Sequence, residues 1–188
     1  SCIPPPHSIY KNIFKLLPGH YLELKENDLK NHLLPKSKSY WSLTEKAIDS
    51  NNNQLLFCEE EIQSELEKKL KLTVKKQMIS DVPIGVFLSG GIDSTIITAM
   101  MQLQSDHPIK TFTIGFSDRD FNEAKYAKKI SNYLGTDHTE LYVSSKQALE
   151  VIPKLPFIYD EPFSDSSQIP TYLVSQLAKN SVKVALTG

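Results

Sequence analysis

Two adjacent glycines, Gly90 and Gly91, lie between a short apolar run and a predicted helix, and this arrangement constrains the fold most. The run 84–88, IGVFL, is typical of a buried strand, and a helix is expected over 92–104. Glycine lets the backbone turn tightly and approach a ligand without a Cβ in the way. The first N–H groups of a helix have no partners within it, so they favour an anion at this point. The sequence therefore predicts a strand–loop–helix unit that binds phosphate groups.

Polar side chains in the loop support this interpretation. Ser89, Ser94 and Thr95 carry hydroxyl groups suited to phosphate oxygens. Asp93 would repel a phosphate, and a Mg²⁺ ion between the two groups would remove that conflict. The loop is neither a Walker A loop nor a dinucleotide fingerprint, because GxxxxGK[ST] and GxGxxG are both absent from it. An ordinary turn with a serine cap is the alternative, but SGGxDS directly after an apolar strand favours the anion site.

Apolar runs and amphipathic segments alternate along the rest of the chain. The expected strands cover 109–116, 139–143 and 182–186, and the expected helices cover 62–78, 123–134 and 167–179. This order predicts βαβ units, and hence an α/β fold with a parallel sheet and helices on both faces. Ligands of such sheets bind outside the carboxyl ends of the strands. The glycine loop is expected at that edge.

The first fifty residues differ in character from the rest. Extended segments are expected at 20–25 and 39–43, and 50–53, SNNN, is typical of a polar linker. We therefore expect a domain boundary there, which divides the chain into residues 1–52 and 53–188.

Composition is that of an ordinary globular protein. Hydrophobic residues make up 40%, charged residues 23%, and the net charge is −1, so neither a nucleic-acid partner nor a membrane-binding basic face is indicated. No apolar run approaches the ~20 residues that span a bilayer. Cys2 and Cys58 lie in no CxxC motif and no metal-like spacing, which favours a reducing, cytoplasmic setting. The chain does not begin with Met, so we expect it to start inside a larger protein.

The loop 89–94, SGGIDS, resembles the pyrophosphate loop of the ATP pyrophosphatase family, whose members split ATP into AMP and pyrophosphate. An ordered set of further segments is similar to the synthetase domain of the glutamine-hydrolysing asparagine synthetase family: 112–116, 121–127, 134–140, 160–165 and 184–188. Residues 5–22 and 40–41 resemble the end of the glutaminase domain of that family. The resemblance implies an adenine nucleotide alpha hydrolase-like fold, preceded by the tail of an α+β glutaminase domain.

The same resemblance implies roles for individual residues. Asp93 and Ser94 would be catalytic, and Asp93 and Glu123 would bind Mg²⁺. Phe87 or Leu88 would contact the adenine of ATP through backbone atoms. The nucleotide-binding residues that it implies are Phe87, Leu88, Ser89, Gly90, Gly91, Asp93, Ser94, Ile114, Gly115, Thr187 and Gly188.

The implied activity is ATP-dependent amide formation. Aspartate would be activated to β-aspartyl-AMP with release of pyrophosphate, and ammonia from glutamine would displace AMP to give asparagine. The ammonia would come from a glutaminase domain of the same parent chain, and a homodimer is compatible with the resemblance. The family continues beyond Gly188 with an acidic glycine-rich turn, a catalytic lysine and a helical region, so we expect an incomplete fragment that is inactive alone.

Two alternative functions stay open. A related amidotransferase would act on another carboxylate, such as a sugar acid or a β-lactam precursor, and the acceptor is expected to be chosen mostly by residues beyond Gly188. A non-catalytic nucleotide-binding module is the second alternative.

Polar residues outside the loop also have open roles. His138 begins a strand and is either a ligand at the pocket mouth or a packing residue. Glu161 stabilises a turn before Pro162 or takes part in catalysis. Asp165, together with the adjoining Ser166 and Ser167, caps the following helix or contacts substrate.

Overall fold

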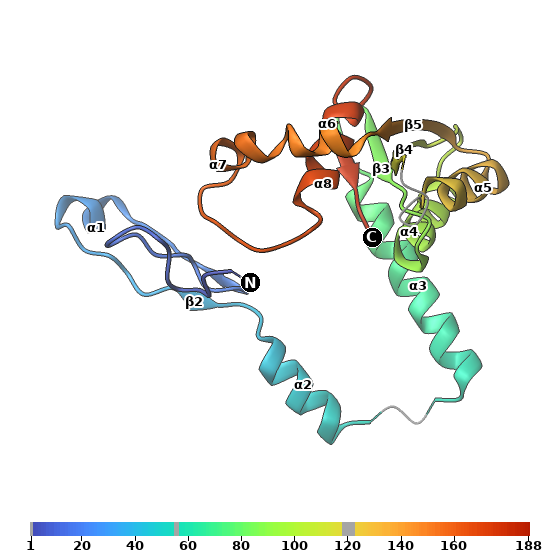
Figure 1. The fold of residues 1–188 in the computed structure, drawn as a ribbon. Coiled ribbons are helices and arrows are strands. Elements are labelled where there is room, and N and C mark those ends of the chain that lie inside the picture. The colour runs from blue at the N-terminus through green and yellow to red at the C-terminus, as the bar shows by residue number, and fades with distance from the viewer. Residues whose placement is uncertain (1, 55–56, 118–122) are drawn as a thin grey trace. The chain divides into compact units, whose positions relative to one another are not determined.

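The computed structural model describes residues 2–54, 57–117 and 123–188 (Figure 1). Phe121 and Asn122, which belong to one of the family-like segments, lie outside the described residues. The chain forms two compact units, Ser1–Leu56 with Tyr159–Asp165, and Phe57–Ile158 with Ser166–Gly188. We describe each unit by itself. The assignment of residues 1–52 to a glutaminase domain stays a prediction.

The smaller unit contains two very short strands and two helices. In chain order they are β1 (His20–Tyr21), α1 (Glu26–Lys30), β2 (Lys38–Ser39) and α2 (Leu43–Asn52). β1 and β2 pair antiparallel, with His20 opposite Ser39. Residues 159–165 join this unit through an ion pair between Lys15 and Glu161.

Two expectations for the smaller unit are wrong. The strands expected over 20–25 and 39–43 are only two residues long, and the linker expected over 50–53 is largely the last turn of α2. Ser42 is the reason that a helix begins here, because its hydroxyl oxygen accepts a hydrogen bond from the Glu45 N–H at 3.3 Å. A serine cap of this kind satisfies one of the free N–H groups in the first helical turn.

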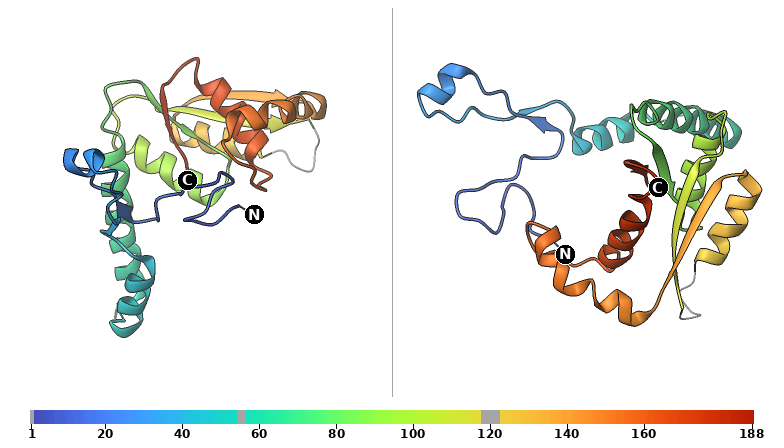
Figure 2. Two further views of the ribbon diagram at one scale, coloured as in Figure 1. Left: turned by 90° about the vertical axis from the view of Figure 1, so that its left-hand side faces the viewer. Right: turned by 90° about the horizontal axis from the view of Figure 1, so that it is seen from above.

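The larger unit is built on a four-stranded parallel sheet, as the alternating pattern predicted (Figures 1 and 2). In spatial order the strands are β5 (Asp137–Val143), β4 (Lys110–Phe116), β3 (Ile84–Phe87) and β6 (Val184–Leu186). Val86 of β3 pairs with Thr111 on one side and with Leu186 on the other. β3 is therefore a central strand, and the loop that follows it leaves the middle of the carboxyl edge.

Helices cover both faces of the sheet, which confirms the predicted arrangement (Figure 2). One face carries α3 (Glu59–Gln77), α4 (Ile92–Gln102) and α5 (Ala124–Leu134), and the other carries α8 (Gln168–Ala178). Val86 packs with Val74 and Met101 on the first face. Its neighbour Phe87 packs against Val174 on the second face, because successive side chains of a strand point to opposite sides.

The chain between β5 and α8 contains helical segments where the sequence pattern indicated no element. It forms three short helical segments, α6 (Ser145–Leu149), η2 (Ile152–Lys154) and α7 (Leu155–Ile158). Val151 of this region is buried with Val143 and Leu173. Segments of three to five residues are too short to show a helical period, so the sequence pattern did not reveal them.

Candidate nucleotide site

The loop after β3 is folded on itself by hydrogen bonds between its own residues. The Ser89 N–H donates to the Ser94 hydroxyl oxygen at 3.2 Å, and the two hydroxyl oxygens lie 2.9 Å apart. The Gly91 N–H donates to the hydroxyl oxygen of Ser89 at 3.2 Å, and the Ser94 hydroxyl donates to the Gly91 carbonyl at 3.3 Å. These bonds tie the end of the strand to the first turn of α4.

The start of α4 has the properties that an anion site requires. Gly91 is the N-cap residue, and no side chain caps this end of the helix. The Gly91 carbonyl accepts from the N–H and the hydroxyl of Thr95, at 3.1 and 2.6 Å. No side-chain cap therefore occupies the start of the helix, the end where the helix dipole is positive.

Two glycines allow close approaches around this helix start. Gly90 has a φ of +88°, and a Cβ placed there would lie 2.9 Å from the Cβ of Tyr126 on α5. A Cβ on Gly188 would lie 2.4 Å from the Ser94 nitrogen. Real Cβ atoms do not come so close, so both positions fit glycine in the present backbone.

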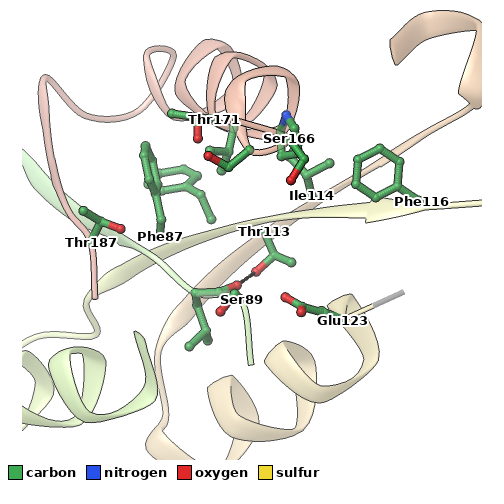
Figure 3. A pocket seen from close by; sticks show the side chains of 14 residues that line it. Phe87, Ser89, Thr113, Ile114, Phe116, Glu123, Ser166, Thr171 and Thr187 are labelled. Carbon is green, nitrogen blue, oxygen red and sulfur yellow. Dashed lines mark hydrogen bonds between the residues drawn. The ribbon is translucent and has the colours of Figure 1, made fainter. Parts of the chain in front are cut away.

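A pocket of about 450 Å³ lies beside the loop (Figure 3). Its lining combines apolar side chains from β3, β4 and α8 with hydroxyl groups and one carboxylate: Phe87, Leu88, Ser89, Phe112, Thr113, Ile114, Phe116, Glu123, Ser166, Ser167, Pro170, Thr171, Val174 and Thr187. An apolar wall with a few convergent polar groups is the usual composition of a small-molecule site. The wall suits a flat aromatic base, and the polar groups suit a sugar and phosphates.

Most of the predicted residues gather at this edge of the sheet. Six of them line the pocket: Phe87, Leu88, Ser89, Ile114, Glu123 and Thr187. Gly90, Gly91, Asp93 and Ser94 form the adjacent loop and helix start, and Gly188 lies against Ser94. Gly115 is not part of the lining, and a Cβ on it would lie 2.7 Å from the Tyr142 ring and 3.1 Å from the Cβ of Ala124.

The two predicted metal ligands fit Mg²⁺ only together with a phosphate ligand. Asp93 and Glu123 are both exposed. Within the described ranges, no group of three or more His, Cys, Asp or Glu side chains could hold a metal ion. Mg²⁺ is commonly bound through one or two carboxylates plus substrate phosphates and water. The carboxylates present are therefore compatible with a nucleotide-dependent ion rather than a permanent one.

Sequence reasoning missed Thr113, whose buried hydroxyl donates to the Leu88 carbonyl in the pocket wall. Threonine is common in strands, so its presence in β4 carried no functional signal. Thr171 was also missed as pocket lining, whereas helix capping and substrate contact had both stayed open for its neighbours in the lining, Ser166 and Ser167. The run SDSS before a helix was visible in the sequence, but helix capping explained it equally well.

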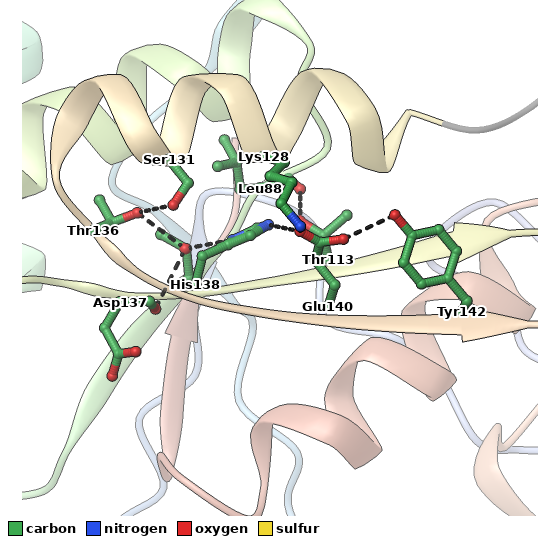
Figure 4. Close-up of polar contacts among 10 residues, drawn as sticks. Leu88, Thr113, Lys128, Ser131, Thr136, Asp137, His138, Glu140 and Tyr142 are labelled. Carbon is green, nitrogen blue, oxygen red and sulfur yellow. Dashed lines mark hydrogen bonds and ion pairs between the residues drawn. The ribbon is translucent and has the colours of Figure 1, made fainter.

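His138 and Glu161 each have a polar partner within their own unit. The His138 Nδ1 lies 2.7 Å from the Thr111 hydroxyl, in a polar layer between the sheet and α5 (Figure 4). Burial lowers the pKa of His138, Lys128 lowers it further, and Glu140 opposes them. Glu161 is paired with Lys15 in the smaller unit. His138 is not among the residues that line the pocket, and its position supports a packing role.

Comparison with known families agrees with this geometry. The family model described as "Asparagine synthase" matches residues 65–188, which include the loop, the sheet and the pocket-lining residues. The chain belongs to the asparagine synthase family. The similarity to asparagine synthetases suggested by the sequence segments is thereby confirmed.

Relatives within the family match nearly the whole chain. A Methanocaldococcus jannaschii protein, provisionally named a glutamine-hydrolysing asparagine synthetase, is 37% identical over 99% of this chain and 34% of its own length. Asparagine synthetase 1 of Bacillus subtilis is 30% identical over 99% of this chain and 27% of its own length. The chain thus spans between about a quarter and a third of these relatives. Among solved structures, an NMN synthetase from Francisella tularensis gives a TM-score of 0.47 at 12% identity, covering 65% of this chain and 52% of that one.

Proposed function

We propose that residues 53–188 form the first part of the ATP-binding domain of a glutamine-hydrolysing asparagine synthetase, and that residues 1–52 are the tail of its glutaminase domain. The observation that carries the proposal is the pocket at the carboxyl ends of β3 and β4, whose polar end adjoins the uncapped start of α4. An apolar wall next to a helix N-terminus matches the two ends of ATP, a base and a chain of phosphates.

The adenine end is assigned to the wall formed by Phe87 and Ile114. Phe87 is a better backbone contact for adenine than Leu88. The Leu88 N–H already donates to the Phe112 carbonyl at 3.0 Å, and the Leu88 carbonyl already accepts from Thr113. Thr187 lies in the same lining, next to Gly188.

The phosphate end is assigned to the loop and the start of α4. The free N–H groups of the first helical turn hold the pyrophosphate, together with the hydroxyl of Ser89, which is exposed in the pocket lining. Ser94 is buried and keeps the loop in shape through its bonds to Ser89 and Gly91. Asp93 and Glu123 would hold Mg²⁺, which supplies positive charge to the leaving pyrophosphate.

The proposed reaction has two steps. A carboxylate oxygen of aspartate attacks the α-phosphorus of ATP, forming β-aspartyl-AMP while pyrophosphate leaves. Ammonia, released from glutamine by the glutaminase domain, then attacks the activated carbonyl, giving asparagine and AMP. The contribution of this chain is to position the triphosphate and to stabilise the departing charge, which are major sources of catalysis in group transfer.

Equilibrium titration of the chain with ATP-Mg²⁺ tests the nucleotide part of the proposal. We expect saturable binding that pyrophosphate competes away, without turnover by this chain alone. Failure to bind either ligand would refute the nucleotide site. Turnover by the chain alone would refute the expectation that catalysis needs residues beyond Gly188.

A related amidotransferase with another acceptor is the second candidate. The relatives at 30% identity and above carry asparagine synthetase names, which favours aspartate as the acceptor. Pyrophosphate release by the full-length protein, measured with aspartate and with other carboxylic acids, separates the two candidates. Within the described part of the chain, no helix is both long enough and apolar enough to cross a bilayer.

A further inference from the structure

The peptide unit between Leu88 and Ser89 is held from both sides. Its carbonyl oxygen accepts a hydrogen bond from the Thr113 hydroxyl on β4 (Figure 4). Its N–H donates to the Ser94 hydroxyl oxygen on α4 at 3.2 Å. Because a trans peptide is planar, its C=O and N–H point in opposite directions, and fixing one end fixes the other.

Thr113 occupies the place where β3 leaves the sheet. The last pair of the β3–β4 ladder joins Phe87 to Phe112, and Leu88 adds one further main-chain bond to the Phe112 carbonyl at 3.0 Å. The chain then turns into the two glycines. At this point the Thr113 hydroxyl, on a side chain only 3% exposed, donates the hydrogen bond that the Leu88 carbonyl accepts. A buried hydroxyl nearly always has a partner, and here its partner is the residue before the loop.

We infer that Thr113 is a positioning residue for the nucleotide site. Through the Leu88–Ser89 peptide it directs the Ser89 N–H onto Ser94, and so sets the shape of the loop that faces the phosphates. The effect on nucleotide affinity rests on the proposed function, whereas the effect on the peptide does not. Figure 3 places Thr113 between Ser89 and Glu123, next to both parts of the proposed phosphate and metal site.

Replacement of Thr113 by valine separates the hydroxyl from the shape of the side chain. Valine has nearly the same volume and suits a strand, but it leaves the Leu88 carbonyl without its donor. The peptide plane can then rotate, and the Ser89 N–H loses its fixed direction. We expect Thr113→Val to weaken ATP-Mg²⁺ and pyrophosphate binding about fivefold to tenfold, the change that one ordinary hydrogen bond corresponds to. Thr113→Ser keeps the hydroxyl and should restore most of the affinity.

Thr111 offers a matched control on the same strand and the same face. It is fully buried like Thr113, but its hydroxyl contacts Thr136 and His138 instead of the loop. Thr111→Val therefore removes a comparable buried hydroxyl without touching the Leu88–Ser89 peptide. It should leave nucleotide affinity unchanged, although it will lower the thermal midpoint.

The experiment measures two quantities for the chain and its three variants: hydrogen exchange at the Ser89 amide by NMR, and equilibrium affinity for ATP-Mg²⁺ and for inorganic pyrophosphate. We expect faster Ser89 exchange and weaker binding only in Thr113→Val. Unchanged exchange in that variant would overturn the positioning role, and so would a similar loss of affinity in Thr111→Val. Faster exchange with unchanged affinity would overturn the functional consequence. If the unmodified chain binds neither ligand, the proposed function fails, while Ser89 exchange still decides whether Thr113 positions the peptide.

Discussion

The hydroxyl oxygens of Ser89 and Ser94 lie 2.9 Å apart, although five positions separate the two residues in the chain. The Ser89 N–H donates to the same Ser94 oxygen, so the end of β3 and the first turn of α4 meet at one atom. Ser94 is 7% exposed, whereas Ser89 is exposed in the pocket lining. One serine thus maintains the loop from inside while the other faces the ligand space.

Ser94→Ala should reduce both stability and nucleotide affinity. The change removes the acceptor of the Ser89 N–H and the donor to the Gly91 carbonyl. Leaving such groups unpaired costs about 1–3 kcal/mol of the free energy of unfolding. Chemical denaturation gives the stability change, and ATP-Mg²⁺ titration should show at least a roughly tenfold loss of affinity. Ser80→Ala is the control for affinity, because the hydroxyl of this exposed serine bonds to the main chain of Val82 in its own turn, and it should leave ATP-Mg²⁺ binding unchanged. Normal affinity of Ser94→Ala would contradict the internal role of this serine.

Gly90→Ala should be far more destabilising than Gly135→Ala. Both glycines have positive φ, +88° and +71°, so both substitutions carry the backbone cost of about 1–2 kcal/mol. Gly135 has nothing within 4 Å of a new Cβ, whereas a Cβ at Gly90 lies 3.0 Å from the Ala127 nitrogen. The extra loss of stability at Gly90 is therefore steric. The loop must move away from α5 to make room for the new Cβ. Thermal denaturation of the two variants provides the comparison, and equal midpoints would contradict the close packing of loop and helix.

Local sequence patterns were sufficient for the central unit because each of its elements is specified by nearby residues. The apolar run before Ser89, the glycine pair and the helix after it lie within twenty residues, and the parallel sheet follows from alternating runs of sufficient length. Gly135 could be predicted as the end of α5, because helices commonly end at a glycine. In the structure Gly135 takes the left-handed conformation that is typical of such an end.

Features that depend on register or on distant contacts could not be predicted in this way. Thr113 reaches Leu88 because β4 lies beside β3, a pairing that no local pattern expresses. Gly115 was expected in the pocket lining, and a ligand role was one of two open roles for His138. Neither residue lines the pocket, because their contacts with Tyr142 and Thr111 are set by the pairing of β4 with β5. The pairing of Glu161 with Lys15 joins residues far apart in the chain. Such contacts follow from the tertiary fold and become visible only with it.

Asp93→Asn should abolish pyrophosphate release by the full-length protein while leaving the fold intact. Asp93 is exposed in the first turn of α4, so the loss of its charge costs little packing. A carboxylate lost from a Mg²⁺ site removes both a ligand and the charge that attracts the ion. Release assays at increasing Mg²⁺ concentration measure the effect. Asp106→Asn changes an exposed carboxylate in the turn after the same helix, and should release pyrophosphate normally. Full activity of Asp93→Asn would contradict the metal role.

His138 should make stability fall as the pH is lowered from neutrality. Burial lowers the pKa of this histidine in the folded chain, Lys128 acts in the same direction, and Glu140 opposes both. Below the ordinary histidine value of about 6.5, the unfolded chain takes up a proton that the folded chain resists. The stabilising contribution is therefore present above that pH and is lost as the pH falls through the lowered folded pKa.

His138→Gln removes this titration while keeping a polar side chain next to Thr111. The free energy of unfolding should vary less between pH 8 and about 5.5 in this variant than in the unmodified chain. Titration of the single His138 side chain can change that free energy by at most about 1.4 kcal/mol per pH unit. Urea denaturation across this range measures the two slopes. His107→Gln alters an exposed histidine in the turn after α4, and its free energy of unfolding should vary with pH as in the unmodified chain. If His138→Gln and the unmodified chain showed the same pH dependence of the free energy of unfolding, the prediction would be contradicted. The His138 ring would then take up its proton as easily in the folded chain as in the unfolded one.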